Sequence, residues 1–281
     1  MRILACLKQV PEKDSRYKID DTATGIREED LVFETNESDV YALEEALRLK
    51  EKLGGEVVVL SLGEERVLKT IKSGLAMGAD SALHLTDPAF RGSDAFVIAT
   101  SIARAISDQN FDVIFTGVQS EDMAFAQTGT ILAQLLGWSH ATIVMEVNVS
   151  EDGKNARVKR ELESNLFEVV EIPLPAVLTI QSGINQPRYA TLKGIMQAKK
   201  KGIRTLSAQD LGLKNSQLGS MGSVVDHQKM FFPEKKKKTV ILEGTPEEAA
   251  RTLMERLHKE RCFSRWPSAE RNSLCLARFW F

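Results

Sequence analysis

The stretch TGVQSEDMAFAQTGT at 116–130 joins the end of a short apolar run to the start of a helical pattern. In open α/β sheets the crevice beyond the carboxyl ends of the strands binds ligands, and free amide groups at a helix start attract phosphate. Gly129 would let a phosphate approach the backbone, and the hydroxyls of Thr128 and Thr130 could donate to its oxygens. The pattern fits a ligand site, and it fits equally a loop that only shapes the turn and caps the helix.

Further segments are expected to open on the same crevice. Residues 6–9 follow the first apolar run of the chain, residues 61–63 follow the second, and residues 36–39 start the first helical pattern. Met123 and Phe125, within the 116–130 stretch, either shape a pocket for a base or simply pack against the fold. The sequence therefore predicts one ligand crevice that is built from several strand ends.

Several kinds of chemistry lose support. The chain has no GxGxxG and no GK[ST] motif, so ordinary dinucleotide or P-loop binding is not expected. Its histidines, His84, His140, His227 and His258, do not stand at metal-ligand spacing from another His or Cys and are interpreted as surface or packing residues. Cys6 lies in an apolar run, where a buried thiol is usually inert. We expect neither a metal site nor a catalytic side chain.

A second feature is the stretch PRYATLKGIMQAKKKGI at 187–203, which places apolar side chains next to a lysine run. An apolar tip fringed by lysines could dock on a partner that offers a hydrophobic pocket with an acidic rim. Alternatively, the apolar groups pack on the protein's own core and the lysines form a solvated face. The residues concerned are Leu192, Ile195, Met196, Lys199, Lys200 and Lys201.

The elements that would position these residues alternate along the first 180 positions. Continuous apolar runs indicate strands buried on both faces, and they alternate with amphipathic helical patterns, which predicts a doubly wound, mostly parallel α/β sheet. After Gly137 four strand-like runs follow with short polar turns and no helix, so this region should be antiparallel or mixed. The expected strands are 3–7, 56–62, 82–86 and 111–116, the expected helices 36–53, 64–77, 93–107 and 123–136, and the later strands 141–149, 156–162, 166–172 and 176–182.

The C-terminal part differs in composition. Residues 206–238 mix Gly, Ser, Gln and the lysine run 235–238, and we expect an extended arm that ends in a solvated linker. Residues 239–243 predict a short strand, and Pro246 begins a final helix. The tail at 261–281 holds two of the three Cys and four Arg but no Lys, which suggests an appended stretch or, alternatively, a segment that docks on a partner.

Composition sets the class of protein. Of the 281 residues 43% are hydrophobic and the formal net charge is −2, so the chain should fold and has no basic field to recruit nucleic acid. No apolar run is long enough for a membrane span or an export signal, and three cysteines cannot make a disulfide framework. A cytoplasmic protein without membrane insertion is the expectation.

Taken together, these segments resemble the β subunit of electron-transfer flavoprotein, including the FixA proteins. The resemblance runs from residue 2 to about residue 260. It is carried in order by CLKQVP at 6–11, YALEEALRLKE at 41–51, GLAMGAD at 74–80, the pattern TG-Q-(x)7-QTG at 116–129, VKRELE at 158–163 and NQPRYATLKGIMQAKKK at 185–201.

The resemblance implies a non-catalytic subunit of a heterodimer with an adenine-nucleotide α-hydrolase-like fold. The α subunit of such proteins carries the redox FAD. The β subunit holds AMP or, in electron-bifurcating members, a second FAD that reacts with NAD(H). Electrons come from acyl-CoA or related dehydrogenases and pass to a quinone reductase or another acceptor. The implied division is a nucleotide-binding domain at 1–205 with a docking loop at 187–201, an arm and helix at 206–260 that contact the α subunit, and a tail at 261–281 outside the family.

The resemblance also implies residue roles. It places Leu192 at the anchor position of the docking loop, Arg188 at the loop's start, and Glu161 at the junction between subunits. Departures from the family pattern are Asn36-Glu37 instead of Asn-Pro, Gln197 in the loop, and fewer acidic residues at 120–126. A stand-alone adenine-nucleotide sensor or hydrolase is the alternative of another class. The implied nucleotide contacts are Cys6, Asn36, Glu37, Ser38, Asp39, Leu62, Gly117, Gln119, Asp122, Gln127, Thr128, Gly129 and Thr130.

Overall fold

A computed structural model describes residues 1–234 and 239–259 of the chain. The chain divides into two contact units, Met1–Phe231 and Phe232–Phe281, and each is described by itself. The first unit contains the sheet and both of the features identified above. The lysine run at 235–238 and the tail at 261–281 lie outside the described residues.

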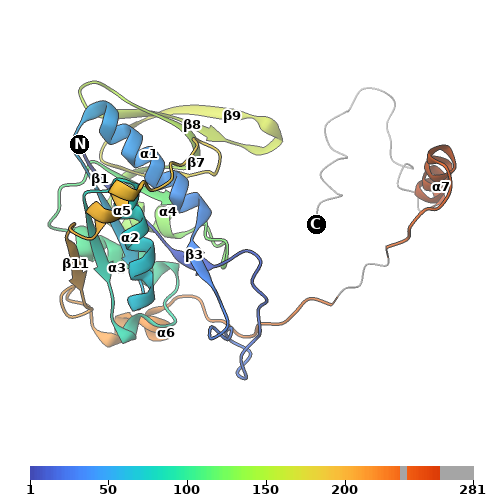
Figure 1. Cartoon of the computed structure of the whole chain (residues 1–281), viewed down its shortest axis with the longest axis horizontal. Coiled ribbons are helices and arrows are strands. Elements are labelled where there is room, and N and C mark those ends of the chain that lie inside the picture. Colours follow the sequence, from blue (N-terminus) through green and yellow to red (C-terminus); the bar gives the residue numbers. More distant parts are fainter. Residues whose placement is uncertain (235–238, 260–281) are drawn as a thin grey trace. The chain divides into compact units, whose positions relative to one another are not determined.

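A nine-stranded sheet forms the centre of the first unit (Figure 1). Its order is β11-β5-β4-β1-β6-β10-β7-β8-β9, and the pairs from β11 through β7 are parallel. The expected doubly wound, mostly parallel sheet is thereby confirmed. The strands are β1 (Arg2–Cys6), β4 (Glu56–Leu62), β5 (Ser81–Leu85), β6 (Val113–Gly117), β7 (Ser139–Val149), β8 (Asn155–Glu161), β9 (Phe167–Pro173), β10 (Ala176–Ile180) and β11 (Ile203–Leu206).

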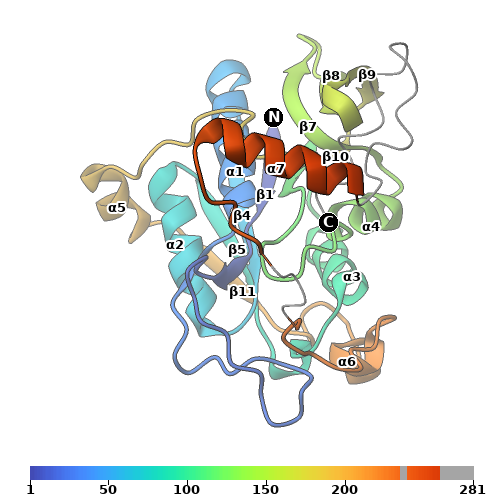
Figure 2. The ribbon, with the colours of Figure 1, turned by 90° about the vertical axis from the view of Figure 1, so that its right-hand side faces the viewer.

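Helices cover both faces of the sheet (Figure 2). Helices α1 (Glu37–Leu53) and α2 (Leu68–Met77) pack on one face, and α3 (Ala95–Ile106) and α4 (Thr128–Leu136) pack on the other. The apolar run of strand β1 is continuous because the strand is covered on both faces. Ile3 and Ala5 belong to the core under α1 and α2, whereas Leu4 belongs to the core under α3 and α4. Alternate side chains of a buried strand must satisfy two apolar layers.

The region after Gly137 is mixed, as expected. Strands β7, β8 and β9 form antiparallel pairs, whereas β10 returns to lie parallel between β6 and β7. Short 3₁₀ turns connect several elements. They are η1 (Glu65–Val67), η2 (Pro88–Phe90), η3 (Glu163–Asn165) and η4 (Asn215–Gln217).

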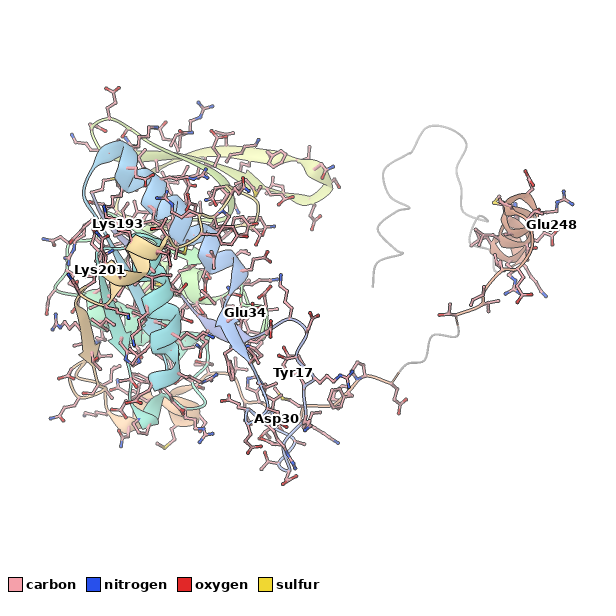
Figure 3. The ribbon with its side chains drawn as sticks, in the orientation of Figure 1. Tyr17, Asp30, Glu34, Lys193, Lys201 and Glu248 are labelled. Atoms are coloured by element: carbon pink, nitrogen blue, oxygen red, sulfur yellow. The ribbon has the colours of Figure 1, made fainter. Side chains whose placement is uncertain are left out.

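The differences from the sequence expectation include one helix start and one small sheet. The helix expected at 123–136 begins only at Thr128, because Ala124 and Ala126 adopt left-handed backbone angles with φ of 52° and 54° that a helix cannot contain. A small antiparallel sheet of β2 (Gln9–Pro11) and β3 (Phe33–Thr35) was not expected; the loop between them contains Tyr17 and Asp30 (Figure 3).

The expectation of an extended arm from residue 206 is wrong for its first part. Strand β11 pairs with β5, and the segment behind it returns to the sheet and packs against the core under α3. Its spaced leucines supply the apolar contacts that the high Gly, Ser and Gln content obscured. The buried residues are Leu206, Ala208, Leu211, Leu213 and Leu218, and the short helix α6 (Gly219–Gly222) follows.

The described part of the second unit contains helix α7 (Pro246–Lys259), which starts at the expected proline. Residues 239–243 do not form the expected strand. A β-rich run becomes a strand only where a neighbouring strand accepts its backbone hydrogen bonds, and none does so among the described residues. Within residues 1–234 and 239–259, no helix is long and apolar enough to cross a membrane.

Candidate functional site

A cavity of about 190 Å³ lies at the carboxyl ends of three strands of the sheet. Cys6 and Lys8 come from the end of β1, Leu62 from the end of β4, and Gly117 and the residues after it from the end of β6. Strands β4, β1 and β6 are neighbours in the sheet, so their ends meet at one edge. The sequence expectation that these segments open on one crevice matches this arrangement.

The start of helix α1 holds the loop after β6 in place. The Asn36 amide Nδ2 donates to the Gln119 carbonyl at 3.0 Å, and the Ser38 hydroxyl donates to the same carbonyl at 2.8 Å. Asn36 Oδ1 accepts from the Glu121 amide at 3.0 Å. Both Asn36 and Ser38 are buried. They fix the loop that forms one wall of the cavity.

Asp39 connects the ends of strands β1 and β6. Its carboxylate accepts the backbone amide of Lys8 at 2.7 Å and that of Gly117 at 2.8 Å. Burial raises the pKa of Asp39 to about 6, although these hydrogen bonds and the nearby Lys8 oppose the rise. A side chain at Gly117 would collide with the Ser38 hydroxyl and the Asp39 carboxylate, so only glycine allows this close approach.

Lys8, which lies in the segment 6–9 expected at the crevice, brings a positive charge to the cavity. Its Nζ donates to Asp122 at 2.6 Å and to Ser120 Oγ at 3.1 Å. A cation at the mouth of a cavity and free amides at a helix start are the two groups that bind phosphate most readily.

Helix α4 contributes such amides in its first turn. Thr128 and Gly129 line the cavity, and the first amides of a helix have no partner within it. The Thr130 hydroxyl donates to the Gln127 carbonyl at 2.8 Å and does not line the cavity. A side chain at Gly129 would lie 2.5 Å from Thr179 Cγ2 and 2.8 Å from Thr116 Oγ1, so packing requires a glycine here.

The implied nucleotide contacts therefore fall into two groups. Four lie beside the cavity without lining it: Glu37, Ser38, Asp122 and Thr130. The others line it: Cys6, Asn36, Asp39, Leu62, Gly117, Gln119, Gln127, Thr128 and Gly129. Burial, and secondarily the Asp39 charge, raises the pKa of the Cys6 thiol, which keeps it protonated.

Several lining residues lie outside the segments that the sequence places at the crevice, among them Asp94 at the start of helix α3 and His227. Lys8 lies within the expected segment 6–9, and Phe125 was expected either to shape a base pocket or to pack. His227, interpreted as a surface or packing residue, stacks on the Phe125 ring with centroids 6.0 Å apart.

The second feature, helix α5 (Leu192–Ala198), lies beside α2 (Figure 2), and its large apolar side chains are exposed. Leu192 is 83% exposed, Met196 69% and Ile195 46%. The alternative that this tip packs inward on the protein's own core is not observed. Lys199 and Lys200 are also exposed, and Figure 3 labels Lys193, within the first turn of α5, and Lys201, beyond its end.

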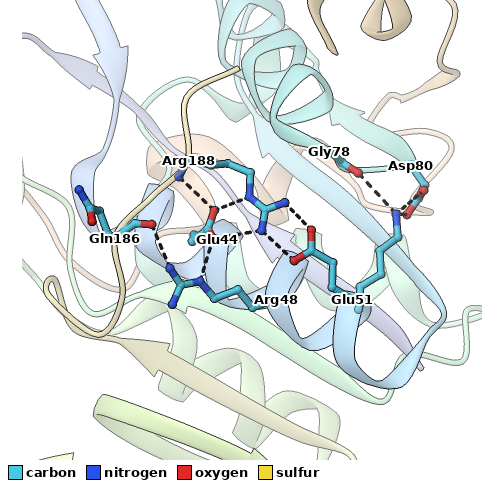
Figure 4. A network of polar contacts seen from close by, with 8 residues as sticks. Glu44, Arg48, Glu51, Gly78, Asp80, Gln186 and Arg188 are labelled. Atoms are coloured by element: carbon cyan, nitrogen blue, oxygen red, sulfur yellow. Dashed lines mark hydrogen bonds and ion pairs between the residues drawn. The ribbon is translucent and has the colours of Figure 1, made fainter. Parts of the chain in front are cut away.

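Both ends of this segment are tied to the body of the protein, and Figure 4 shows the Arg188 end. Arg188 donates to the buried Glu44 and to Glu51 of helix α1. At the other end, Lys201 Nζ donates to the carbonyls of Leu75 and Ala79, at the end of α2, and burial lowers its pKa. These two basic residues fasten the segment to the body of the protein.

Glu161, implied to lie at a junction between subunits, is the last residue of β8 and accepts from Gln181 at 3.2 Å. Exposed apolar side chains lie close to it in sequence, on the turn between β8 and β9 and on β9. They are Leu162, Leu166, Phe167 and Val169.

Comparison with known proteins identifies the family. Residues 24–211 match the sequence profile of the electron transfer flavoprotein domain. The chain is 39% identical over 257 residues to the electron transfer flavoprotein subunit beta of Methylophilus methylotrophus, covering 91% of this chain and 97% of the relative. The chain belongs to the electron-transfer flavoprotein β-subunit family.

Other members show the breadth of this family. The subunit beta of Thermoanaerobacterium thermosaccharolyticum is 36% identical over 92% of this chain and 98% of its own. The caffeyl-CoA reductase-Etf complex subunit CarD of Acetobacterium woodii is 35% identical over 92% of this chain and 99% of its own. Electron-transfer flavoprotein β subunits thus match nearly the full length of this chain, and the resemblance drawn from the motifs is confirmed.

Proposed function

We propose that this chain pairs with an electron-transfer flavoprotein α subunit and that its cavity holds AMP. The redox-active FAD is held mainly by the α subunit. Acyl-CoA or related dehydrogenases dock on residues 187–201 and deliver electrons, which leave to a quinone reductase or another acceptor. The proposal includes a cytoplasmic location and assigns no catalytic side chain to this chain.

The observation that carries this proposal is the chemistry of the cavity. The amides of Thr128 and Gly129 and the Lys8 ammonium, which is paired with Asp122, are groups suited to a phosphate. Apolar residues such as Leu62 and Ile98 also line the cavity. A ligand with a phosphate at one end and an aromatic base at the other meets both requirements.

The size of the cavity favours the smaller of the two adenine ligands. Sites for drug-sized ligands usually measure about 300–1,000 Å³, whereas this cavity measures about 190 Å³. Either ligand would extend beyond the cavity, and a FAD would extend further because its isoalloxazine would have to lie outside. The second candidate, a bifurcating subunit that holds FAD here, is favoured only by the similarity to CarD, a subunit of a reductase-Etf complex.

Two features of residues 187–201 support the docking role: their large apolar side chains are exposed, and the segment is attached to the body of the protein. Large apolar side chains that point to solvent on a short, firmly anchored helix are typical of a recognition surface. Leu192 projects from the first turn of α5, and Thr191 caps this helix by accepting the Gly194 amide at 3.0 Å. The segment therefore presents its apolar tip without having to fold on binding.

The roles of this chain's own residues follow from that arrangement. A flavin supplies the electron chemistry when bound, and the protein contributes binding, orientation and electrostatics. Asn36, Ser38 and Asp39 hold the strand ends together around the cavity. Helix α5 positions a donor enzyme. Glu161 and the apolar residues near it are our candidates for the contact with the α subunit.

One experiment tests the proposal. The chain is co-expressed with an α subunit, and the purified complex is acid-quenched so that released compounds can be identified and counted by chromatography. We expect a yellow heterodimer that releases one FAD and one AMP. Two FAD and no AMP would establish the bifurcating alternative. A single FAD without any further adenylate would overturn the cavity assignment, and a colourless, monodisperse single chain would favour the stand-alone sensor.

A further inference from the structure

Residues 223–230 form a strap that runs from helix α3 to the loop between β2 and β3, and one of its residues lines the cavity. At its first end, the amides of Val224 and Val225 donate to Asp94 Oδ2 at 2.7 and 3.1 Å. At its other end, the Met230 amide donates to the Ala23 carbonyl at 2.6 Å. Between these two attachments His227 reaches the cavity.

Asp94 serves two elements with its two oxygens. Oδ1 accepts the Val97 amide at 3.0 Å and caps helix α3, whereas Oδ2 holds the strap. The backbone amide of Asp94 also donates to Ser223 Oγ at 3.0 Å. Asp94 is buried and itself lines the cavity, so the attachment of the strap lies in the cavity wall.

The strap brings a second aromatic ring to the cavity. The rings of His227 and Phe125 are stacked with an interplanar angle of 28°. Phe125 remains 40% exposed, and both residues line the cavity. Aromatic rings that line a cavity can stack with any nucleobase, because every base has a π face.

We propose that His227 and Phe125 bind the base of the nucleotide and that the strap, through Asp94, controls how fast the nucleotide leaves. This inference rests on the proposed function, because it concerns the same cavity. In this proposal His227 and Phe125, which are more than 100 positions apart in the sequence, give the cavity its preference for a nucleotide that carries a base. The phosphate is bound separately, at the start of α4.

The binding of the base and the role of the strap are tested with different variants. His227→Ala and Phe125→Ala remove one ring each. Asp94→Asn keeps an oxygen that can cap α3, but its amide group cannot accept from Val224 and Val225, so it releases the strap while the helix start is preserved. Ser223→Ala weakens the same attachment, because it removes the hydroxyl that accepts the backbone amide of Asp94. Lys229→Ala, an exposed strap residue that does not line the cavity, is the matched control.

The test uses the co-expressed heterodimer after its nucleotide has been removed, with AMP and ribose 5-phosphate as probes. Calorimetry gives affinities and exchange of labelled AMP gives dissociation rates. We expect each ring variant to lose roughly tenfold or more in AMP affinity. Ribose 5-phosphate, which lacks the base, should bind all forms alike or too weakly to measure in any. Asp94→Asn and Ser223→Ala should release AMP several-fold faster, and Lys229→Ala should match the wild type.

The outcomes separate this inference from the proposed function. If the wild-type complex neither retains nor binds AMP, the proposed function fails and the inference fails with it. If the wild type binds AMP but the ring variants bind it equally well, the base assignment alone is overturned. If AMP leaves Asp94→Asn and Ser223→Ala at the wild-type rate, the role of the strap is overturned. Thermal melting of each variant shows that it is folded.

Discussion

Arg188 Nε lies 2.8 Å from Glu44 Oε2, so a buried carboxylate of helix α1 holds the start of the docking segment. The Glu44 side chain is only 3% exposed. Burial alone would raise the pKa of Glu44, but the hydrogen bonds from Arg188 and Arg48 outweigh it and hold the pKa below its ordinary value. The same helix begins at the cavity, and it therefore positions both functional features.

Replacing Arg188 with alanine should destabilise the protein. The change leaves Glu44 buried with only Arg48 as its ionic partner, and an incompletely paired buried carboxylate costs about 2 kcal/mol. Urea unfolding measures the loss. Lys193→Ala, the removal of an exposed cation in the same segment, should stay within about 0.5 kcal/mol. Equal effects of the two variants would contradict the anchoring role of Arg188.

Replacing Leu192 with alanine should impair docking and leave stability unchanged. The side chain is 83% exposed in the free chain, so its removal costs the fold little. A central apolar anchor is worth about 2 kcal/mol or more in a complex, which corresponds to roughly thirtyfold weaker binding. The readout is electron transfer from a dehydrogenase to the heterodimer at subsaturating concentration. Val32→Ala, at an exposed site on the loop before β3, is the control, and an unchanged rate for Leu192→Ala would refute the assignment.

Local sequence patterns predicted the helices and strands well. They predicted less well which residues come together at the cavity. Strand β4 and helix α1 were predictable because a buried strand must be apolar on both faces and an amphipathic helix repeats its apolar residues. The same logic located the strand ends around the cavity. The segment 6–9, which contains Lys8, was expected at the crevice, but the contacts of the Lys8 ammonium could not be predicted because they join residues more than 100 positions apart.

The C-terminal part of the first unit shows a second limit. Leu211, Leu213 and Leu218 are buried, yet their segment is rich in Gly, Ser and Gln and shows neither strand nor helix periodicity. Such a segment packs because the sheet edge at β5 and the face of α3 offer it apolar surface. His227 reaches the cavity only because this packing brings the chain back past Asp94.

Asp39 should make stability depend on pH in a defined direction. Its pKa is about 6 in the folded protein and about 3.8 when unperturbed, so the native state binds more protons between these values. Stability should therefore fall as the pH rises from about 4 to about 6, by about 3 kcal/mol from this group. Asp39→Asn should lose this part of the slope in urea unfolding series. A variant with the wild-type slope would show that the carboxyl titrates normally.

Gly117 should tolerate no side chain, because its position fixes the distance between strand β6 and the start of α1. A Cβ there would meet the Ser38 hydroxyl and the Asp39 carboxylate and would lie 2.9 Å from the Asp39 amide. Gly117→Ala must therefore push α1 away from β6 and break the bond from the Gly117 amide to Asp39. Overpacking of this kind costs about 1–3 kcal/mol.

The same displacement should open the cavity wall, so the Gly117→Ala heterodimer should release little or no AMP on acid quenching. Gly202→Ala is the matched control, because a Cβ at Gly202 meets nothing within 4 Å. Its stability and nucleotide content should equal those of the wild type. If Gly117→Ala retained a full complement of AMP, the end of β6 would not belong to the nucleotide site, and the ligand would have to be held by α4 and Lys8 without it.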